Sequence, residues 1–140
     1  MKTFVLISAL MSFIDPHTPE PAGDKEAIVR RYFSGWEKKD WSIVASTLAD
    51  GFTFTSPAPD DHIPTDRFHD KCWPQAPHIR TFEFVRIMEQ GDEVMAIMQV
   101  ITVDNKVIRN VEYFRFEGDK IKSIEVFFGG TGAGFPTNAK

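Results

Sequence analysis

The stretch "VEYFRFEGDKIKSIEVFFGG", residues 111–130, reads as two strands joined by a tight turn. Alternate side chains of a strand share a face, so Glu112 stands on the same face as Phe114 and Phe116. Two interpretations are open. Either this face is solvated and the phenylalanines are exposed, or Glu112 projects into a largely apolar cavity.

The segments before this hairpin predict further strands. From Ile79 onward, "IRTFEFVRIMEQ", "EVMAIMQVITV" and "KVIRNVEYFRF" are rich in β-branched and aromatic residues. The short turns "QGDE", "DNK" and "EGDK" separate these segments from one another and from "KIKSIEVFF". The C-terminal half therefore predicts a meander of antiparallel strands.

The N-terminal half predicts two helices. Asp24 can cap a first helix and Asp40 a second one. Apolar residues follow with helical spacing, and these are Ile28, Val29, Tyr32, Phe33, Gly35 and Trp36 in the first helix and Trp41, Val44, Ala45 and Leu48 in the second.

One strand and one short helix connect these helices to the meander. The segment "GFTFTSP" alternates and places Phe52, Phe54 and Ser56 on one face before Pro57 ends the strand. After the loop "SPAPDDHIP", Thr65 can cap a short helix that Pro74 stops.

Helices followed by a strand meander predict an α+β fold, with a curved antiparallel sheet packed against the N-terminal helices. Long strands with glycines and bulges tend to coil into a half-open cone, and a cone with an apolar interior is a pocket. We expect residues 24–130 to form this domain and residues 131–140 an irregular tail.

The composition limits the classes of function. A chain of 140 residues with 42% hydrophobic and 26% charged residues suits one globular domain. The net charge of −4 and the lack of a Lys/Arg run argue against nucleic-acid and membrane partners. The 13 phenylalanines suit a cavity lined with rings or a core filled with them.

Residues 1–23 form an N-terminal extension with two interpretations. Lys2 precedes the apolar run "FVLISALMSFI", which is too short to span a bilayer and resembles a secretory signal without an A-x-A-like cleavage site. The alternative is an extension that packs on the domain surface or on a neighbouring subunit. The proline-rich "DPHTPEPAG" behind it is a linker. We expect a cytoplasmic protein, or a secreted or periplasmic one if residues 1–14 act as a signal.

Two segments carry a resemblance to a known family. Residues 30–57, "RRYFSGWEKKDWSIVASTLADGFTFTSP", and residues 111–129, "VEYFRFEGDKIKSIEVFFG", are similar to the corresponding parts of ketosteroid isomerases and SnoaL-like polyketide cyclases. These proteins belong to the nuclear-transport-factor-2-like superfamily, and the resemblance covers about residues 24–130. It implies a cone-shaped, cystatin-like fold and a pocket for a small hydrophobic ligand, without a cofactor.

The resemblance implies roles for individual residues. Tyr32 falls where the isomerases have an oxyanion-hole tyrosine, and Glu112 where they have a carboxylic acid kept protonated by apolar surroundings; ketosteroid isomerase is itself a standard illustration of this effect. The catalytic base of that family is an Asp before a proline, and this chain has Ser56 there. Serine does not shuttle a proton near neutral pH without an activating partner.

The chemistry of Glu112 and of the loop leaves alternatives open. Burial should raise the pKa of Glu112 unless Tyr32 or Asn110 stabilises the anion, and a structural hydrogen bond to Tyr32 is the alternative to a catalytic role. Asp61 or His62 could supply the base that Ser56 does not, or the loop could be a solvated polar turn.

Other residues complete the predicted pocket. We expect ligand-binding side chains among the following residues: Trp36, Phe54, Ser56, Trp73, Asn110, Ile124, Val126 and Phe128. The opposite face of the fourth predicted strand mixes charge and apolar bulk, which suits a homodimer through the sheet; its residues are Arg109, Val111, Tyr113 and Arg115.

Three further motifs do not change the prediction. The spacing of His62, His69 and their neighbouring aspartates fits no standard metal site. Cys72, the single cysteine, is best explained as a packing residue. "GGTGAG" lacks the following helix that a dinucleotide fingerprint needs.

The sequence thus predicts a domain that binds a hydrophobic ligand with a carbonyl or hydroxyl group. Cofactor-independent isomerisation, cyclisation, dehydration or hydrolysis is one expectation for it. Its catalytic residues would be Tyr32 and Glu112, with Asp61 or His62 moving the proton. A non-catalytic ligand-binding or association module of the same fold is the alternative.

Overall fold

The computed structural model describes residues 24–57 and 59–128, so the N-terminal extension, the 131–140 tail and the predictions made for them lie outside the described residues. Within these residues, the elements in chain order are α1 (Asp24–Lys38), α2 (Trp41–Ala45), β1 (Leu48–Thr55), β2 (Ile63–Pro64), α3 (Thr65–Cys72), the 3₁₀ helix η1 (Trp73–His78), β3 (Ile79–Gln90), β4 (Glu93–Thr102), β5 (Val107–Glu117) and β6 (Lys120–Phe128).

The strands described form one six-stranded sheet in the order β2-β1-β6-β5-β4-β3. Strands β3 to β6 make the antiparallel meander that the sequence predicts. The pairing of β1 was not predicted. This strand lies parallel to β6, with Phe54 opposite Ile124. This pair brings the end of β1 beside the last strand of the meander.

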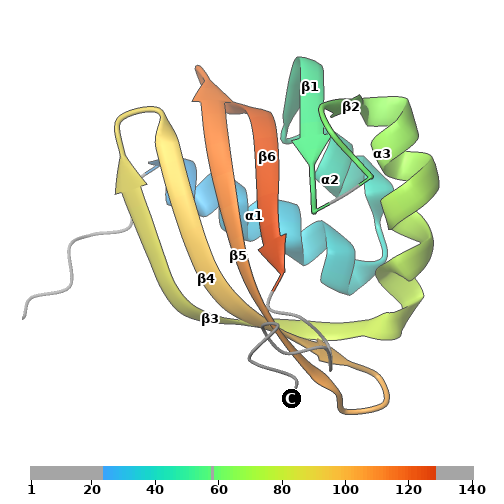
Figure 1. The fold of residues 1–140 in the computed structure, drawn as a ribbon. Helices are drawn as coiled ribbons and strands as arrows, with labels where there is room; N and C mark the ends of the chain where they lie inside the picture. Colours follow the sequence, from blue (N-terminus) through green and yellow to red (C-terminus); the bar gives the residue numbers. More distant parts are fainter. Residues whose placement is uncertain (1–23, 58, 129–140) are drawn as a thin grey trace, which may run out of the picture.

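Bulges explain why the sheet curves. The pairing register shifts between Phe84 and Arg86 in β3 and between Arg115 and Phe116 in β5. A bulged strand bends and twists more strongly than a regular one. Figure 1 shows the long strands curving, with α1 lying across one face of the sheet and α3 beside β1 and β2. The predicted α+β fold with a curved sheet against N-terminal helices is confirmed.

The first two helices follow the predicted pattern with two corrections. Asp24 is the first residue of α1 and not its cap, and α2 is shorter than predicted. Asp40 caps α2 as expected, because its carboxylate accepts a hydrogen bond from the Ser42 N–H at 2.9 Å. However, α2 ends at Ala45, and Leu48 belongs to β1, where it is paired with Ile121. The Thr47 carbonyl accepts from the Ile121 N–H at 2.8 Å, which draws the chain into the sheet.

The third helix differs from the prediction at its start. Pro64 occupies the N-cap position without a side-chain hydrogen bond, so Thr65 is the first helical residue and not the cap. The α-helix does end before Pro74, but the chain continues as η1, which contains Pro74 and Pro77. Pro74 is tolerated because it lies in the first turn of η1, where the N–H groups lack an intrahelical partner anyway.

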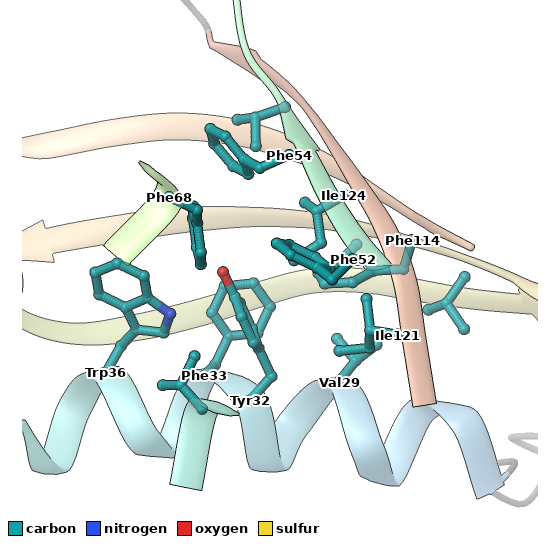
Figure 2. Close-up of a cluster of buried hydrophobic side chains, with 14 of the residues drawn as sticks. Val29, Tyr32, Phe33, Trp36, Phe52, Phe54, Phe68, Phe114, Ile121 and Ile124 are labelled. Atoms are coloured by element: carbon teal, nitrogen blue, oxygen red, sulfur yellow. The ribbon is translucent and has the colours of Figure 1, made fainter. Parts of the chain in front are cut away.

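Aromatic rings fill the core between α1 and the sheet (Figure 2). Tyr32 and Phe33 on α1 both meet Phe114 on β5 edge to face, with ring centroids 5.8 and 5.9 Å apart. Phe68 on α3 contacts Phe54 on β1 at 4.7 Å. These contacts bind α1 to β5 and α3 to β1, on either side of β6, and set the walls of the space between the helices and the sheet.

Candidate functional site

A cavity of about 410 Å³ lies between the helices and the inner face of the sheet. Its walls are mostly apolar and aromatic, with a few polar groups, which is typical of small-molecule sites. The lining residues are Tyr32, Phe33 and Trp36 from α1, Phe54 from β1, Ser56 and Asp60 from the following loop, Phe68, Lys71 and Cys72 from α3, Gln75 and His78 from η1, Ile79 and Phe82 from β3, Val100 and Thr102 from β4, Ile108, Asn110 and Glu112 from β5, and Val126 from β6.

Glu112 is buried in this wall and is only 8% exposed. Its cross-strand neighbours, Ala96 on β4 and Val126 on β6, are both buried and apolar. Burial raises the pKa of Glu112 to about 8, so the carboxyl is mostly protonated at neutral pH. Of the two interpretations of this strand face, the structure supports the apolar cavity.

Glu112 has one hydrogen bond from a neighbouring side chain. Its Oε1 accepts from Nδ2 of Asn110 at 3.1 Å. Among the described residues, its Oε2 and the Oδ1 of Asn110 have no hydrogen-bond partner. The structural hydrogen bond to Tyr32 that was the alternative explanation of Glu112 is not among those formed by the described residues.

Tyr32 lines the same cavity from α1. Burial, and then the negative charge of Glu112 when it ionises, raise the pKa of the Tyr32 phenol, and the nearby Trp36 N–H acts in the opposite direction with a smaller effect. The phenol is therefore neutral throughout the physiological range and can donate a hydrogen bond. Figure 2 shows its hydroxyl pointing away from α1, toward Phe68.

Trp36 and Phe54 lie in the wall as the sequence predicts. The Trp36 ring packs against Tyr32 at 6.3 Å and against Phe68 at 6.0 Å, and its Nε1 is buried with no hydrogen-bond partner among the described residues. The cavity wall thus contains several buried polar atoms that the described residues do not pair.

The position before Pro57 holds Ser56, which lines the cavity, and the loop behind it returns to the same wall. The Ser56 N–H donates to the carbonyl of Asp60 at 2.9 Å. Asp60 also lines the cavity, its side chain is 15% exposed, and its carboxylate pairs with the Lys71 ammonium. A carboxylate therefore lies in the wall four residues beyond the position where the sequence lacks one.

Asp61 and His62, predicted to move a proton, do not line the cavity. Their side chains are 79% and 74% exposed, and they pair with each other. The His62 N–H donates to Oγ1 of Thr55 at 3.0 Å, which holds this part of the loop at the surface. The sequence-based assignment of these two residues to the pocket is not supported by their positions.

The remaining predicted ligand-binding residues differ in whether they line the cavity. Ser56, Asn110 and Val126 line the cavity, whereas Trp73 and Ile124 do not. Trp73 packs outside the wall against Trp36 and Trp41 at 5.0 and 5.3 Å, and Ile124 is a fully enclosed core residue. The backbone of Phe128 ends β6, and its side chain lies outside what the structure describes.

The sequence analysis missed several polar lining residues, namely Asp60, Lys71, Gln75, His78 and Thr102. Gln75 and His78 belong to η1, which follows the predicted helix stop at Pro74. Cys72 is half-buried, and burial, followed by the charge of Asp60, raises the pKa of its thiol to about 11. This thiol is not activated, in agreement with a packing role.

Metal-ligating side chains are not clustered in the part of the chain that the structure describes. No group of three or more His, Cys, Asp or Glu side chains is arranged there to hold a metal ion. No helix in residues 24–57 or 59–128 is long and apolar enough to cross a membrane.

Known structures share this architecture. A protein of unknown function with a cystatin-like fold from Methylobium petroleophilum PM1 matches with a TM-score of 0.68 and 14% identity, over 84% of this chain and 82% of that one. A protein assigned as a SnoaL-like polyketide cyclase from Jannaschia sp. CCS1 matches with a TM-score of 0.64 and 11% identity, over 80% and 90%.

A protein assigned as a ketosteroid isomerase from Kribbella flavida DSM 17836 matches with a TM-score of 0.65 and 15% identity, over 77% of this chain and 79% of that one. At such identities the likeness concerns the fold alone. No curated protein sequence matches this chain. The sequence model of the SnoaL-like domain matches residues 29–124, which is most of the described region. The chain therefore belongs to the SnoaL-like domain family.

Proposed function

We propose that this protein binds a small, mostly apolar ligand in the cavity and that Glu112 and Tyr32 donate hydrogen bonds to a carbonyl or hydroxyl oxygen of that ligand. The observation that carries the proposal is the state of Glu112. It is a buried carboxyl with a pKa of about 8, in a cavity of about 410 Å³, and one of its oxygens has no partner among the described residues. A protonated carboxyl in such a place is a hydrogen-bond donor aimed at a neutral acceptor.

The same arrangement supports acid/base chemistry on the bound ligand. Donors that are already in place in a water-poor site stabilise negative charge that develops on a ligand oxygen. Asp60 is a carboxylate in the same wall and could take a proton from the carbon beside a carbonyl. In an isomerisation, Asp60 would return that proton to a different carbon, so no cofactor would be consumed.

Binding is tested by thermal unfolding with three probes of similar size, naphthalene, naphthol and acetonaphthone. We expect the two oxygen-bearing probes to raise the melting temperature more than naphthalene does, because a ligand of the native state stabilises it. Tyr32→Phe should weaken the oxygen-bearing probes about 2- to 13-fold, the value of one hydrogen bond, and leave naphthalene unchanged. Equal shifts with all probes, or none, would contradict the proposal.

Turnover is tested with a β,γ-unsaturated cyclic ketone, whose isomerisation forms a conjugated enone that absorbs in the ultraviolet. Asp60→Asn should abolish the rate and leave the affinity for the ketone unchanged, whereas Asp61→Asn, the exposed neighbour, should leave both unchanged. Loss of the rate in both variants, or in neither, would remove Asp60 from the mechanism.

A non-catalytic ligand-binding protein is the second candidate. The observation that favours it is Ser56, which occupies the wall position where the isomerases have their base. In this case the probes bind, and each is recovered unchanged after long incubation at every pH. A rate that depends on Asp60 would exclude this candidate.

A further inference from the structure

Three buried polar atoms in the cavity wall have no hydrogen-bond partner among the described residues: Nε1 of Trp36, Oδ1 of Asn110 and Oε2 of Glu112. Their side chains belong to residues only 6%, 4% and 8% exposed, and all three residues line the cavity. Native proteins pair nearly all buried polar groups, and an unpaired one is costly. This cluster indicates what the missing partner must offer.

Each atom has a definite hydrogen-bonding sense. The indole nitrogen of Trp36 can only donate. Because Oε1 of Glu112 already accepts from Nδ2 of Asn110, the proton of the neutral carboxyl falls to Oε2, which then donates. The Oδ1 of Asn110 can only accept. The wall therefore presents donors and one acceptor.

The acceptor lies next to a donor. Asn110 and Glu112 are two residues apart on the same face of β5, and they are joined by their 3.1 Å hydrogen bond. The terminal torsions of Asn and Glu side chains are broad, so small rotations turn these oxygens toward a ligand. Figure 2 shows the Trp36 nitrogen and the Tyr32 hydroxyl facing the same space beneath Phe68. The donors of α1 thus face the cavity that the β5 pair lines from the sheet.

We propose, on the basis of the proposed function, that the ligand has a neutral head group in which a carbonyl oxygen stands beside an N–H or O–H donor, as in a primary carboxamide or a hydroxy ketone. A carbonyl oxygen has two lone pairs, so it accepts from Glu112 and from one donor of α1. The neighbouring N–H or O–H donates to Oδ1 of Asn110. This head group pairs Oδ1 of Asn110 and Oε2 of Glu112, which the described residues leave unpaired.

A carboxylate head group fits the wall poorly. It carries no hydrogen for Oδ1 of Asn110. Its charge would lie beside Glu112 in a mostly apolar cavity, whose lysine, Lys71, is already paired with Asp60. A simple ketone satisfies the donors and leaves Asn110 unpaired. We therefore expect the affinity to be highest for a carboxamide, lower for a methyl ketone and lowest for a carboxylate.

The test measures dissociation constants of naphthamide, acetonaphthone and naphthoate, with the same ring attachment and with naphthalene as the baseline. Measurements are made at about pH 6, where Glu112 is protonated. We expect naphthamide to bind about 2- to 10-fold more tightly than acetonaphthone, and naphthoate to bind most weakly.

Two variants separate the contribution of Asn110 to ligand binding from that of Trp36. Asn110→Ala should make naphthamide and acetonaphthone bind equally, and the matched control Gln90→Ala, an exposed amide at the end of β3, should keep the native ratio. Trp36→Phe should weaken both probes and leave their ratio unchanged.

Equal affinity of the wild-type protein for naphthamide and acetonaphthone would overturn this inference and leave the proposed function standing. An amide preference that survives Asn110→Ala would overturn it in the same way. Failure of every oxygen-bearing probe to bind better than naphthalene would overturn both. Because the ranking in the wild-type protein can overturn the inference on its own, the inference stays testable if either variant fails to fold.

Discussion

Replacing Glu112 with glutamine should change how the stability of the protein depends on pH. Burial raises the pKa of this carboxyl to about 8 from an ordinary value of 4.5. Between these two values the folded protein keeps a proton that the unfolded chain releases. The unfolded state then binds fewer protons, so the free energy of unfolding falls as the pH rises from about 4.5 to about 8.

The size of the effect follows from the interval between the two pKa values. Each pH unit within it lowers the free energy of unfolding by about 1.4 kcal/mol, and the whole interval corresponds to about 5 kcal/mol. Single domains have a total stability of about 5–15 kcal/mol, so this one carboxyl should be visible in any unfolding experiment. Glutamine has nearly the same shape and does not titrate.

The measurement is urea unfolding of the wild-type protein and of Glu112→Gln from about pH 5 to about pH 9. The two should be of similar stability near pH 5, and the variant should become the more stable protein as the pH rises to about 8. The matched control Glu125→Gln removes an exposed carboxyl of β6 and should follow the wild-type curve. A difference between Glu112→Gln and wild type that stays constant over this range would refute the burial argument.

Three further predictions concern packing, reactivity and assembly. A Cβ at Gly35 would lie 2.7 Å from Cγ2 of Val44, so Gly35→Ala should lower the free energy of unfolding by about 1–3 kcal/mol in urea unfolding, and an unchanged value would contradict the close approach of α1 and α2. With a pKa of about 11, Cys72 should react with iodoacetamide on the order of 100-fold more slowly in the native than in the unfolded protein at about pH 8, and equal rates would contradict its burial. If the outer face of the sheet forms a homodimer, Phe127→Glu, at a side chain that is 52% exposed, should lower the molecular mass measured by light scattering, and a wild-type monomer at all concentrations would exclude the dimer.

The strands were predictable because their signals are local. Segments such as residues 79–90 and 93–102 carry dense β-branched and aromatic residues bounded by short turns, and the structure places β3 and β4 there. The parallel pairing of β1 with β6 has no such signal, because its partners are more than sixty residues apart in the chain. The extent of α2 was overestimated since Leu48 continues the helical spacing, although its backbone pairs with Ile121.

The site residues on regular elements were also predictable. Helical spacing and strand alternation put Tyr32 and Glu112 on inward faces, and both line the cavity. Periodicity distinguishes inward-facing from outward-facing residues. It does not distinguish inward-facing residues that line the cavity from those that pack in the solid core. Ile124 shares the inward face with Val126, yet only Val126 lines the cavity. That distinction depends on how far the sheet curves, which arises from bulges whose positions the sequence does not announce.

The acidic residue of the cavity could not be chosen from sequence because Asp60 and Asp61 are neighbours in an irregular loop. No period orients a loop side chain, so the two carboxylates look alike until the backbone path is known. The path depends on the Ser56 N–H donating to the Asp60 carbonyl and on a left-handed backbone at His62, with a φ of 51°. Histidine is among the residues that adopt this conformation more often than most, but the sequence does not show when it does. Because the loop turns at these two points, Asp60 reaches the cavity wall beside Ser56, while Asp61 faces solvent. Two adjacent residues in the sequence are therefore a candidate base and a surface charge.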